Sequence, residues 1–286
     1  MVATVEEALR QVASLLQGGG IEQPRHEARI LLRHVTGLSR ERLLLCHRSE
    51  IEEPALTELI GLARRRRARE PIAYLIGERE FWGLSFEVTR DTLIPRPDSE
   101  TLIEAVLHFT NQAGHECPRI LDFGIGSGCL LVSLLTEIPL AMGFGVDRSF
   151  AALTVARRNA ARHDVSTRVH FVAGSWGDAL APPFDLIIAN PPYVAAGERA
   201  AIMPDVRDYE PAEALFAGPR GDEAYRALAP EFSRLLTPAG RVFVEFGAGM
   251  AEEAAAIICS SGLFECERRK DLAGIERCGV FELAGT

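Results

Sequence analysis

The chain has 286 residues, of which 47% are hydrophobic and 25% are charged, so it can bury a substantial core. Its length is near the limit of a single core and predicts two domains, and its composition excludes a disordered chain. The formal net charge of −9, with a pI of about 5.4, argues against a long nucleic-acid groove, which would need many Lys and Arg contacts to phosphate.

No targeting or membrane segment is recognisable. The first residues lack the basic start and apolar stretch of a signal peptide, and no apolar run reaches membrane-spanning length. The six cysteines include no C-x-x-C pair, so we predict neither a disulfide framework nor a zinc site and assign no metal ligands. We therefore expect a cytoplasmic protein that does not bind membranes.

Residues 1–73 predict a small bundle of helices. Apolar side chains recur every three or four residues in three stretches: 5–16, 28–35 and 56–63. Gly18 and Gly37 fit the ends of two of these helices, and Ser39 fits the N-cap of a further one. This organisation is that of a minor domain at the start of the chain.

Five arginines lie at the end of the last of these helices: Arg64, Arg65, Arg66, Arg67 and Arg69. Cations at this end are favoured by the helix dipole, and such a run usually forms a solvated face. The alternative is a docking site for an acidic or RNA partner. The pattern alone does not separate the two.

After residue 73 the pattern changes from helical spacing to alternation, which predicts a strand or hairpin in a linker of residues 74–95. The alternation places Phe81 on one side and Trp82 and Phe86 on the other. We expect this segment to join the two domains.

The next segment is stiffened by prolines. Arg96 lies between Pro95 and Pro97, which hold its backbone extended and fix the direction of its guanidinium. Either Asp98 or Ser99 fits the N-cap of the helix that follows.

Residues 96–286 predict an α/β domain, because from residue 119 onward apolar strands alternate with helices. The predicted strands are 119–123, 141–146, 168–172, 184–189, 241–246, 264–268 and 279–283. This alternation indicates a Rossmann-like, mainly parallel sheet with helices on both faces. Ligands bind such sheets at the carboxyl ends of the strands.

A glycine-rich loop, Gly-Ile-Gly-Ser-Gly, occupies residues 124–128 between the first predicted strand and an apolar helix. Such a loop lets the backbone approach a ligand, and the helix N-terminus offers free N–H groups. Cys129 replaces the last glycine of the G-x-G-x-x-G pattern, and the Lys-Ser/Thr ending of a phosphate loop is missing. The loop therefore predicts a nucleotide-like ligand without phosphate, with a plain tight turn as the alternative.

Asp147 ends the second predicted strand, the place from which a carboxylate accepts hydrogen bonds from ribose hydroxyls. With the glycine loop, it indicates adenosine without phosphate, as in S-adenosylmethionine. Asp122 either is a strand-end acid with protein partners or binds the methionine ammonium. Trp176 either lies over the adenine ring or fills the core.

The motif Asn190-Pro191-Pro192-Tyr193 directly follows the predicted strand 184–189. Proline cannot donate to a strand ladder, so the strand stops and Asn190 lies at its carboxyl end. The amide oxygen of Asn190 and the carbonyl of Pro191 are acceptors that suit a substrate –NH2 group. The alternative is a proline-rich turn in which the asparagine bonds its own backbone.

Taken together, these motifs resemble those of the peptide chain release factor N5-glutamine methyltransferases, which are class I S-adenosylmethionine-dependent methyltransferases. The resemblance covers nearly the full length. It is carried by 81–84 (Phe-Trp-Gly-Leu), 93–100 (Leu-Ile-Pro-Arg-Pro-Asp-Ser-Glu), 122–128, 190–194, 209–211 (Tyr-Glu-Pro) and 271–274 (Asp-Leu-Ala-Gly). Residues 81–84 and 93–100, with the helical domain, are far more specific to the family than the glycine loop.

The resemblance implies roles for individual residues. The S-adenosylmethionine contacts would be Gly124, Ile125, Gly126, Ser127, Gly128, Asp147, Trp176 and Asn190. The catalytic residues would be Asn190, Pro191 and Tyr193, and the substrate glutamine would be held by Asn190, Pro191, Pro192 and Tyr193. Ile125 and Phe123 stand where the family usually has Thr and Leu. A hydroxyl contact from position 125 is thereby lost, and we expect weaker cofactor affinity.

The resemblance also implies a division of labour along the chain. Residues 1–73 would form a substrate-docking domain, 74–95 a β-hairpin linker, and 96–286 the methyltransferase domain of a class I fold. The implied reaction is methylation of the glutamine side-chain nitrogen in the Gly-Gly-Gln motif of a release factor. We expect a monomer that acts in translation termination and forms no stable complex with nucleic acid.

Three other functions share parts of this pattern. The same Asn-Pro-Pro-Tyr site serves glutamine methylation of a ribosomal protein, and it can grip an aromatic amine for adenine-N6 methylation of DNA or RNA. The acidic balance and the lack of a basic, aromatic-rich recognition domain count against nucleic acid. The last alternative is an inactive fold kept as a binding module, against which the intact residues 190–193 speak.

Overall fold

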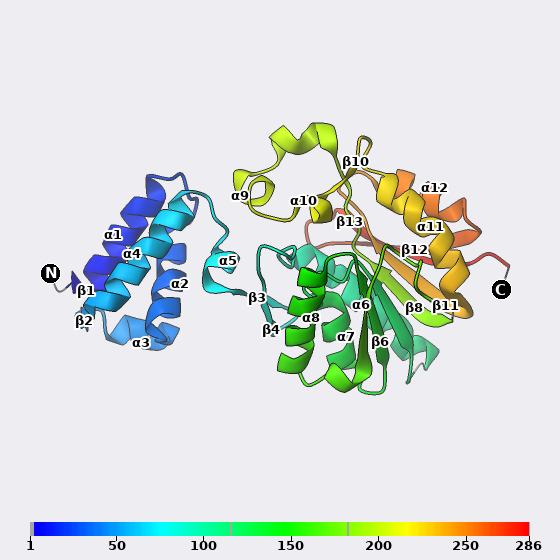
Figure 1. Cartoon of the computed structure of the whole chain (residues 1–286), viewed down its shortest axis with the longest axis horizontal. Helices are drawn as coiled ribbons and strands as arrows, with labels where there is room; N and C mark the ends of the chain where they lie inside the picture. Colours follow the sequence, from blue (N-terminus) through cyan, green and yellow to red (C-terminus); the bar gives the residue numbers. More distant parts are fainter. Residues whose placement is uncertain (1–2, 115, 182, 286) are drawn as a thin grey trace. The chain divides into compact units, whose positions relative to one another are not determined.

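The structure, a computed structural model, describes residues 3–114, 116–181 and 183–285. Its chain divides into two compact units (Figure 1). The helical unit contains the chain up to Glu78 together with Met203–Tyr209, and the sheet unit contains Arg79–Ile202 and the chain from Glu210 onward. The segment Met203–Tyr209 thus packs with the helical unit although it lies far along the sequence.

The helical unit is built from short elements around an apolar core. They are β1 (Ala3–Thr4), α1 (Val5–Gln17), α2 (Pro24–Thr36), α3 (Arg40–Leu45), β2 (Glu50–Ile51), α4 (Glu53–Arg67), α5 (Ile72–Ile76) and α9 (Pro204–Arg207). Gly37 ends α2 in the left-handed conformation, and the Ser39 hydroxyl accepts a hydrogen bond from the Arg42 amide at the start of α3. Both helix boundaries confirm the sequence prediction.

The arginine run at the end of α4 does not act as one surface. Arg64, Arg65 and Arg67 are exposed, whereas Arg66 is buried. The Arg66 guanidinium lies 2.5 Å from the Glu27 carboxylate of α2 and 2.6 Å from the Asp205 carboxylate of α9. This arginine therefore fixes the segment Met203–Tyr209 to α2 and α4, a role that neither alternative from the sequence included.

The segment after the helical unit forms a hairpin of β3 (Glu78–Phe81) and β4 (Leu84–Glu87). Its turn consists of Trp82 and Gly83, both with positive φ, 52° and 69°. Phe81 and Phe86 pack edge to face with ring centroids 6.3 Å apart. The predicted placement of these two rings on opposite sides is wrong, because the turn reverses the chain between them.

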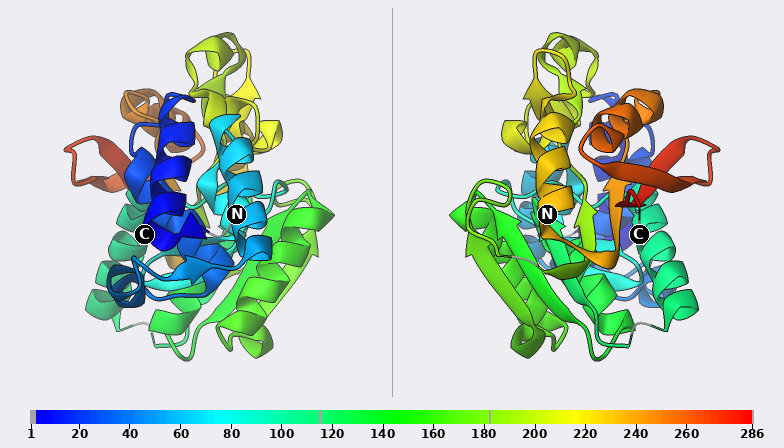
Figure 2. Two further views of the ribbon diagram at one scale, coloured as in Figure 1. Left: turned by 90° about the vertical axis from the view of Figure 1, so that its left-hand side faces the viewer. Right: turned by 90° about the vertical axis from the view of Figure 1, so that its right-hand side faces the viewer.

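The sheet unit contains a seven-stranded sheet in the order β12-β13-β11-β8-β5-β6-β7. Its strands are β5 (Arg119–Phe123), β6 (Met142–Asp147), β7 (Val169–Ala173), β8 (Phe184–Ala189), β11 (Leu236–Glu245), β12 (Leu263–Lys270) and β13 (Glu276–Leu283). β13 runs antiparallel to both of its neighbours, β11 and β12, and Figure 2 shows its hairpin with β12, coloured orange to red, at one edge of the sheet. The predicted Rossmann-like fold is confirmed.

Helices cover both faces of this sheet (Figures 1 and 2). On one face lie α6 (Glu100–Ala113), α7 (Cys129–Glu137) and α8 (Phe150–Arg162), and on the other lie α11 (Glu223–Leu235) and α12 (Ala251–Cys259). The remaining elements are η1 (Pro97–Ser99), η2 (Ser166–Arg168), β9 (Val194–Ala195), η3 (Ala196–Ala201), α10 (Ala212–Leu215) and β10 (Phe216–Gly218). Among the described residues, no helix combines the length and apolarity that crossing a bilayer requires.

Candidate active site

A cavity of about 570 Å³ lies at the carboxyl ends of β5, β6, β7 and β8, a size within the usual range of small-molecule sites, roughly 300–1,000 Å³. Of the residues singled out from the sequence, its lining includes Gly124, Gly126, Asp147, Trp176, Asn190, Pro191 and Pro192. The lining does not include Ile125, Ser127, Gly128 or Tyr193. The structure therefore brings the glycine loop, Asp147 and the motif 190–193 to one cavity. Some residues of the loop and of the motif do not line it.

The conformation of the glycine loop is set by its glycines and by hydrogen bonds to β6. Gly124, Gly126 and Gly128 have φ angles of 70°, 53° and 83°, which only glycine adopts readily. The amides of Gly124 and Ile125 donate to the carbonyl of Val146, at 2.9 and 3.0 Å. The loop thus crosses the end of β6, with its backbone against the cavity.

The side chain of Ile125 belongs to the core and not to the cavity. It is 4% exposed, and it occupies the space beside Gly145 of β6. A Cβ added to Gly145 would lie 2.1 Å from the Ile125 Cδ1. The side chain of Ile125 therefore sets how closely the loop approaches β6, while its neighbours Gly124 and Gly126 line the cavity.

A buried asparagine that the sequence analysis missed supports the loop from below. Asn159 of α8 donates from Nδ2 to the carbonyl of Ser127 at 2.8 Å and to that of Glu87 at 2.9 Å. Its Oδ1 accepts from the Glu87 amide at 2.7 Å. Because all these partners are main-chain groups, Asn159 fastens the glycine loop to β4.

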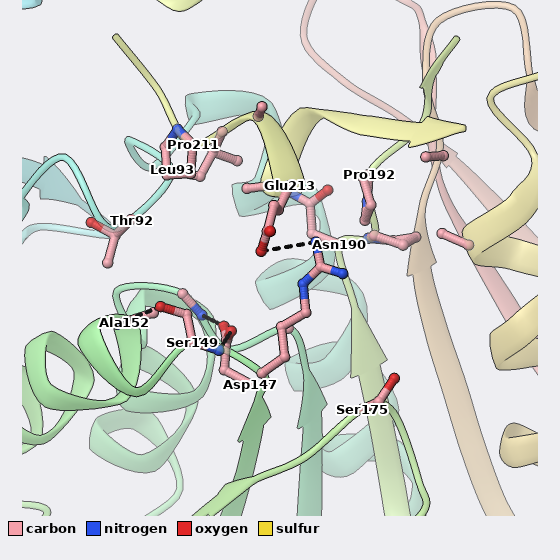
Figure 3. A pocket seen from close by; sticks show the side chains of 18 of the residues that line it. Thr92, Leu93, Asp147, Ser149, Ala152, Ser175, Asn190, Pro192, Pro211 and Glu213 are labelled. Carbon is pink, nitrogen blue, oxygen red and sulfur yellow. Dashed lines mark hydrogen bonds and ion pairs between the residues drawn. The ribbon is translucent and has the colours of Figure 1, made fainter. Parts of the chain in front are cut away.

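Asp147 is held by the backbone at the rim of the cavity. One carboxylate oxygen accepts from the Gly126 amide at 3.0 Å, and the other accepts from the Ser149 amide at 2.9 Å (Figure 3). Carboxylate oxygens have further lone pairs, so they can still accept from ribose hydroxyls. The aspartate is therefore oriented before a ligand arrives.

Asp122 is a buried acid of β5, just before the glycine loop. Its side chain is 1% exposed, and within the described residues neither carboxylate oxygen has a hydrogen bond. Burial raises the pKa of this carboxyl well above its usual range, and the nearby Asp147 carboxylate adds to the shift. The backbone of Leu131 acts in the opposite direction and lowers this pKa. The neutral form of the carboxyl is thereby favoured, and Asp122 is not part of the cavity lining.

Trp176 follows β7 and contacts both the cavity and the core. Its φ of 47° is unusual for a bulky residue and holds the ring in place. The indole lines the cavity and packs edge-on against Phe123, with centroids 6.4 Å apart. Trp176 thus combines the two alternatives from the sequence: its indole borders the ligand cavity and also fills part of the core.

Asn190 belongs to a buried chain of hydrogen bonds. Its Nδ2 donates to the Ser99 hydroxyl at 3.2 Å, and this hydroxyl donates to the Glu245 carboxylate at 2.5 Å. No described residue donates to the Asn190 Oδ1, and Asn190 lines the cavity. The asparagine is therefore not the self-bonded turn residue of the alternative interpretation.

The predicted helix cap before α6 is wrong. Ser99 stands at the N-cap position but makes no capping hydrogen bond, because its hydroxyl contacts Glu245. Asp98 instead pairs with Arg277 of β13 at 2.9 Å. Both side chains of the Asp-Ser pair are thus used to join the start of α6 to the sheet.

Arg96 is fixed by a buried acid. Its guanidinium lies 2.6 Å from the carboxylate of Glu210, which also accepts from the Ile94 amide at 3.1 Å. The pair joins the segment before α6 to the segment after β9. The sequence analysis attributed the direction of the Arg96 guanidinium to the two flanking prolines. In the structure, the ion pair with Glu210 also sets it.

Tyr193 packs beside the cavity and not in its lining. A Cβ added to Gly247 would lie 2.7 Å from the Tyr193 Cδ2, so the ring covers this glycine. Burial raises the pKa of its phenol to about 12, and the Glu245 carboxyl adds to the shift. The phenol is therefore neutral near pH 7.

One ion pair spans the cavity. Arg148, the residue after Asp147, lies 2.9 Å from the Glu213 carboxylate of α10, and Figure 3 marks the pair with a dashed line. Both side chains are more than half exposed. Such an exposed pair contributes little to stability.

The sequence analysis missed Ser99 and Glu245 as partners of Asn190, although one signal was available. Glu245 is an acid that interrupts the apolar part, 242–246, of a predicted strand at the same sheet edge as Asn190. A charge in that position needs a partner or a function. The contact itself joins residues 146 positions apart, which no local pattern predicts.

Comparison with known proteins gives consistent matches. Residues 7–77 match the family described as PrmC N-terminal domain, and residues 99–205 match the family described as Methyltransferase small domain. The chain is similar to the release factor glutamine methyltransferase of Rhodospirillum rubrum, with 41% identity over 96% of this chain and 86% of that protein. It is also similar to the release factor glutamine methyltransferase of Bordetella pertussis, with 44% identity over 89% of this chain and 93% of that protein.

Solved structures show a similar fold at low sequence identity. A methyltransferase from Pyrococcus furiosus superimposes with a TM-score of 0.51 at 19% identity, over 78% of this chain and 99% of that chain. At this identity the likeness concerns the fold alone.

Proposed function

The chain belongs to the family of release factor glutamine methyltransferases, and we propose that it methylates the side-chain amide nitrogen (N5) of the glutamine in the Gly-Gly-Gln motif of a peptide chain release factor. It is a class I, S-adenosylmethionine-dependent methyltransferase. The proposal concerns its substrate and the residues that handle it.

The cavity fits S-adenosylmethionine, which supplies a methyl group on a positively charged sulfur. Asp147, at its rim, suits a ligand with hydroxyl or cationic groups. We propose that the cofactor contacts are Gly124, Ile125, Gly126, Ser127, Gly128, Asp147, Trp176 and Asn190. Ile125, Ser127 and Gly128 would act through their main chain or by supporting the loop.

The glutamine amide is a poor nucleophile, because its nitrogen lone pair is delocalised into the carbonyl. If the Asn190 Oδ1 and the Pro191 carbonyl accept its two hydrogens, the lone pair is turned toward the methyl group. Such positioning can lower a barrier by about 7 to 11 kcal/mol when the reacting atoms are well aligned. Pro192 would stiffen this grip, and the Tyr193 ring would pack against the planar amide.

The chain does not need a strong base for this reaction, since a methylated amide nitrogen is very acidic and loses its proton readily. No histidine or lysine occurs among the described residues that line the cavity. Tyr193, with its raised pKa, is no base either. Catalysis then rests on geometry, in which Asn190, Pro191 and Tyr193 are the catalytic residues.

The observation that carries the proposal is the state of the Asn190 amide. Its Nδ2 is already engaged by Ser99, while its Oδ1 has no donor among the described residues and belongs to the cavity lining. A site with a free acceptor selects a substrate that brings N–H groups, as a carboxamide does. An exocyclic adenine amine brings them too, but the net charge of −9 disfavours nucleic acid.

We further propose that residues 1–73 dock the release factor, that 74–95 are a linker, and that 96–286 carry out the transfer. The protein would act as a cytoplasmic monomer in translation termination.

A single labelling experiment tests the proposed substrate. Purified protein is incubated with methyl-labelled S-adenosylmethionine and, side by side, with a release factor, a ribosomal protein fraction and DNA. We expect the label on the release factor, at the side chain of the Gly-Gly-Gln glutamine when mapped by mass spectrometry. A release factor in which this glutamine is replaced by alanine is the matched control, and label on the ribosomal or DNA sample alone would refute the proposal.

A further inference from the structure

The residue after β8 and the last residue of β11 lie side by side. The two strands are parallel neighbours in which Ala189 pairs with Val244. Both of these side chains belong to the core on the α11 face. Because side chains alternate along strands, the next residues, Asn190 and Glu245, turn to the opposite face, where Ser99 precedes α6 at its N-cap position.

Ser99 bridges the two side chains by hydrogen bonds. The Asn190 Nδ2 lies 3.2 Å from the Ser99 Oγ, which lies 2.5 Å from the Glu245 Oε2. Ser99 is 3% exposed and Glu245 is 2% exposed, so water competes little for these bonds. A hydroxyl has one hydrogen, so it can donate to only one of its two neighbours.

We propose that Ser99 and Glu245 are positioning residues that set the orientation of the Asn190 amide, so that its Oδ1 and not its Nδ2 faces the substrate. A Glu245 carboxylate can only accept, so the Ser99 hydroxyl must donate to it. The hydroxyl oxygen then accepts from the Asn190 Nδ2, and the Oδ1 is left for the substrate. This inference rests on the proposed function, in which that oxygen accepts from the glutamine amide.

A proton on Glu245 permits the opposite arrangement. The protonated carboxyl can donate to the Ser99 oxygen, and the Ser99 hydroxyl then donates to the Asn190 Oδ1. The amide is thereby flipped, and its Nδ2 meets the N–H groups of the substrate, donor against donor. The direction of the three-residue chain therefore depends on the protonation state of Glu245.

The surroundings place this titration near neutral pH. Burial raises the pKa of Glu245 to about 7. The Ser99 hydrogen bond and the cations Arg277 and Arg96 act in the opposite direction and lower this pKa. Arg277 is shared, since it also pairs with Asp98 and with Asp271. The other charged or titratable groups around Glu245 are Asp98, Tyr193, Tyr225, Cys129 and Cys278.

The kinetic test uses three variants. In the unmodified protein we expect kcat to fall as the pH decreases through about 7, because the productive orientation requires the carboxylate. Ser99→Ala should lower kcat by roughly tenfold, the weight of one hydrogen bond, with the Kd for S-adenosylmethionine unchanged. Ser99→Thr keeps the hydroxyl and should retain activity, and Glu245→Gln should remove the pH dependence because its amide does not titrate.

A spectroscopic test needs no substrate. The ¹⁵N resonance of the Asn190 side-chain amide should titrate with the midpoint of Glu245 in the unmodified protein, and in neither Ser99→Ala nor Glu245→Gln. Tyr225→Phe is the matched control, because it removes a buried hydroxyl that contacts the Glu245 main chain and not its carboxylate. This variant should keep the titration.

The kinetic and the spectroscopic measurements distinguish a failure of this inference from a failure of the proposed function. An Asn190 resonance that does not follow the Glu245 titration, or a pH profile unchanged in Glu245→Gln, would overturn the inference. If the resonance titrates as expected but the release factor is not methylated, the proposed substrate is wrong and the positioning chain stands.

Discussion

At the scale of single residues, the cofactor loop depends on a glycine that lies outside it. Gly145 of β6 leaves room for the Ile125 side chain, which reaches to where a Cβ at 145 would be, 2.1 Å from its Cδ1. This tight fit couples the core of the sheet to the position of the loop main chain. The size of residue 125 should therefore affect both stability and cofactor binding.

Gly145→Ala should lower the free energy of unfolding by about 1–3 kcal/mol, because the added methyl overpacks a closed core. It should also weaken S-adenosylmethionine binding, since Ile125 must move and carries the loop with it. Adding Ile125→Val removes the Cδ1 and should recover part of both losses. Urea denaturation and titration calorimetry measure the two effects.

The control for this prediction is Gly197→Ala, in a part of the sheet unit where an added Cβ meets no atom within 4 Å. It should leave both quantities nearly unchanged. Strictly additive effects of Gly145→Ala and Ile125→Val would contradict the packing explanation.

Much of the site was predictable at this scale because the motifs are local. Asp147 and residues 190–192 were placed by the rule that ligands bind at the carboxyl ends of parallel strands, and the cavity contains them. Glu245 and Asn159 were not found, since their partners lie far away in sequence. Only tertiary contact shows that Ser99 is a bridge and not a cap.

At the scale of elements, the sequence placed the strands well. β5 and β8 have the predicted bounds, because each is a short apolar run with clear limits. A strand or hairpin was predicted for this linker and a hairpin is found, but the sides of its residues were misjudged, since its turn contains Trp82 at positive φ, where turn patterns lead one to expect Asn or Gly. The alternating pattern was therefore continued across the turn as if the chain were one straight strand.

The elements of the helical unit are joined by Arg66. Its guanidinium contacts Glu27 of α2 and Asp205 of α9 while its own side chain is buried. Removing the arginine deprives two partly buried carboxylates of their close cation, and leaves Asp205 only the more distant Arg69, at 3.6 Å, among the described ion pairs. Such a change is costly because the acids lose their partner and cannot be fully solvated.

Arg66→Ala should therefore destabilise the protein by about 3 kcal/mol, near the lower end for broken buried ion pairs. It should also make the segment Met203–Tyr209 more susceptible to limited proteolysis, since Asp205 loses its main contact. Chemical denaturation and a proteolysis time course test the two effects. Arg64→Ala, an exposed arginine of the same helix, should behave like the unmodified protein, and equal losses in both variants would contradict the account.

At the scale of the whole molecule, one segment departs from the order of the sequence. Met203–Tyr209 packs with the helical unit, although the chain on both sides of it belongs to the sheet unit. The segment begins ten residues after Tyr193 and ends just before Glu210, which holds Arg96. A linear division of the chain could not predict this return, because it depends on the ion pairs of Arg66.

The account as a whole depends on one claim, that the acceptors at Asn190 and Pro191 grip the glutamine amide in front of the methyl donor. The direct measurement compares Asn190→Ala with Asn111→Ala, an exposed asparagine of α6. S-adenosylmethionine affinity and methyl transfer to a release factor are measured for both variants.

We predict that Asn190→Ala binds S-adenosylmethionine nearly as well as the unmodified protein, while methyl transfer falls by at least about a hundredfold, since positioning supplies most of the acceleration. Asn111→Ala should retain both properties. Methyl transfer by Asn190→Ala at the rate of the unmodified protein would contradict the central claim.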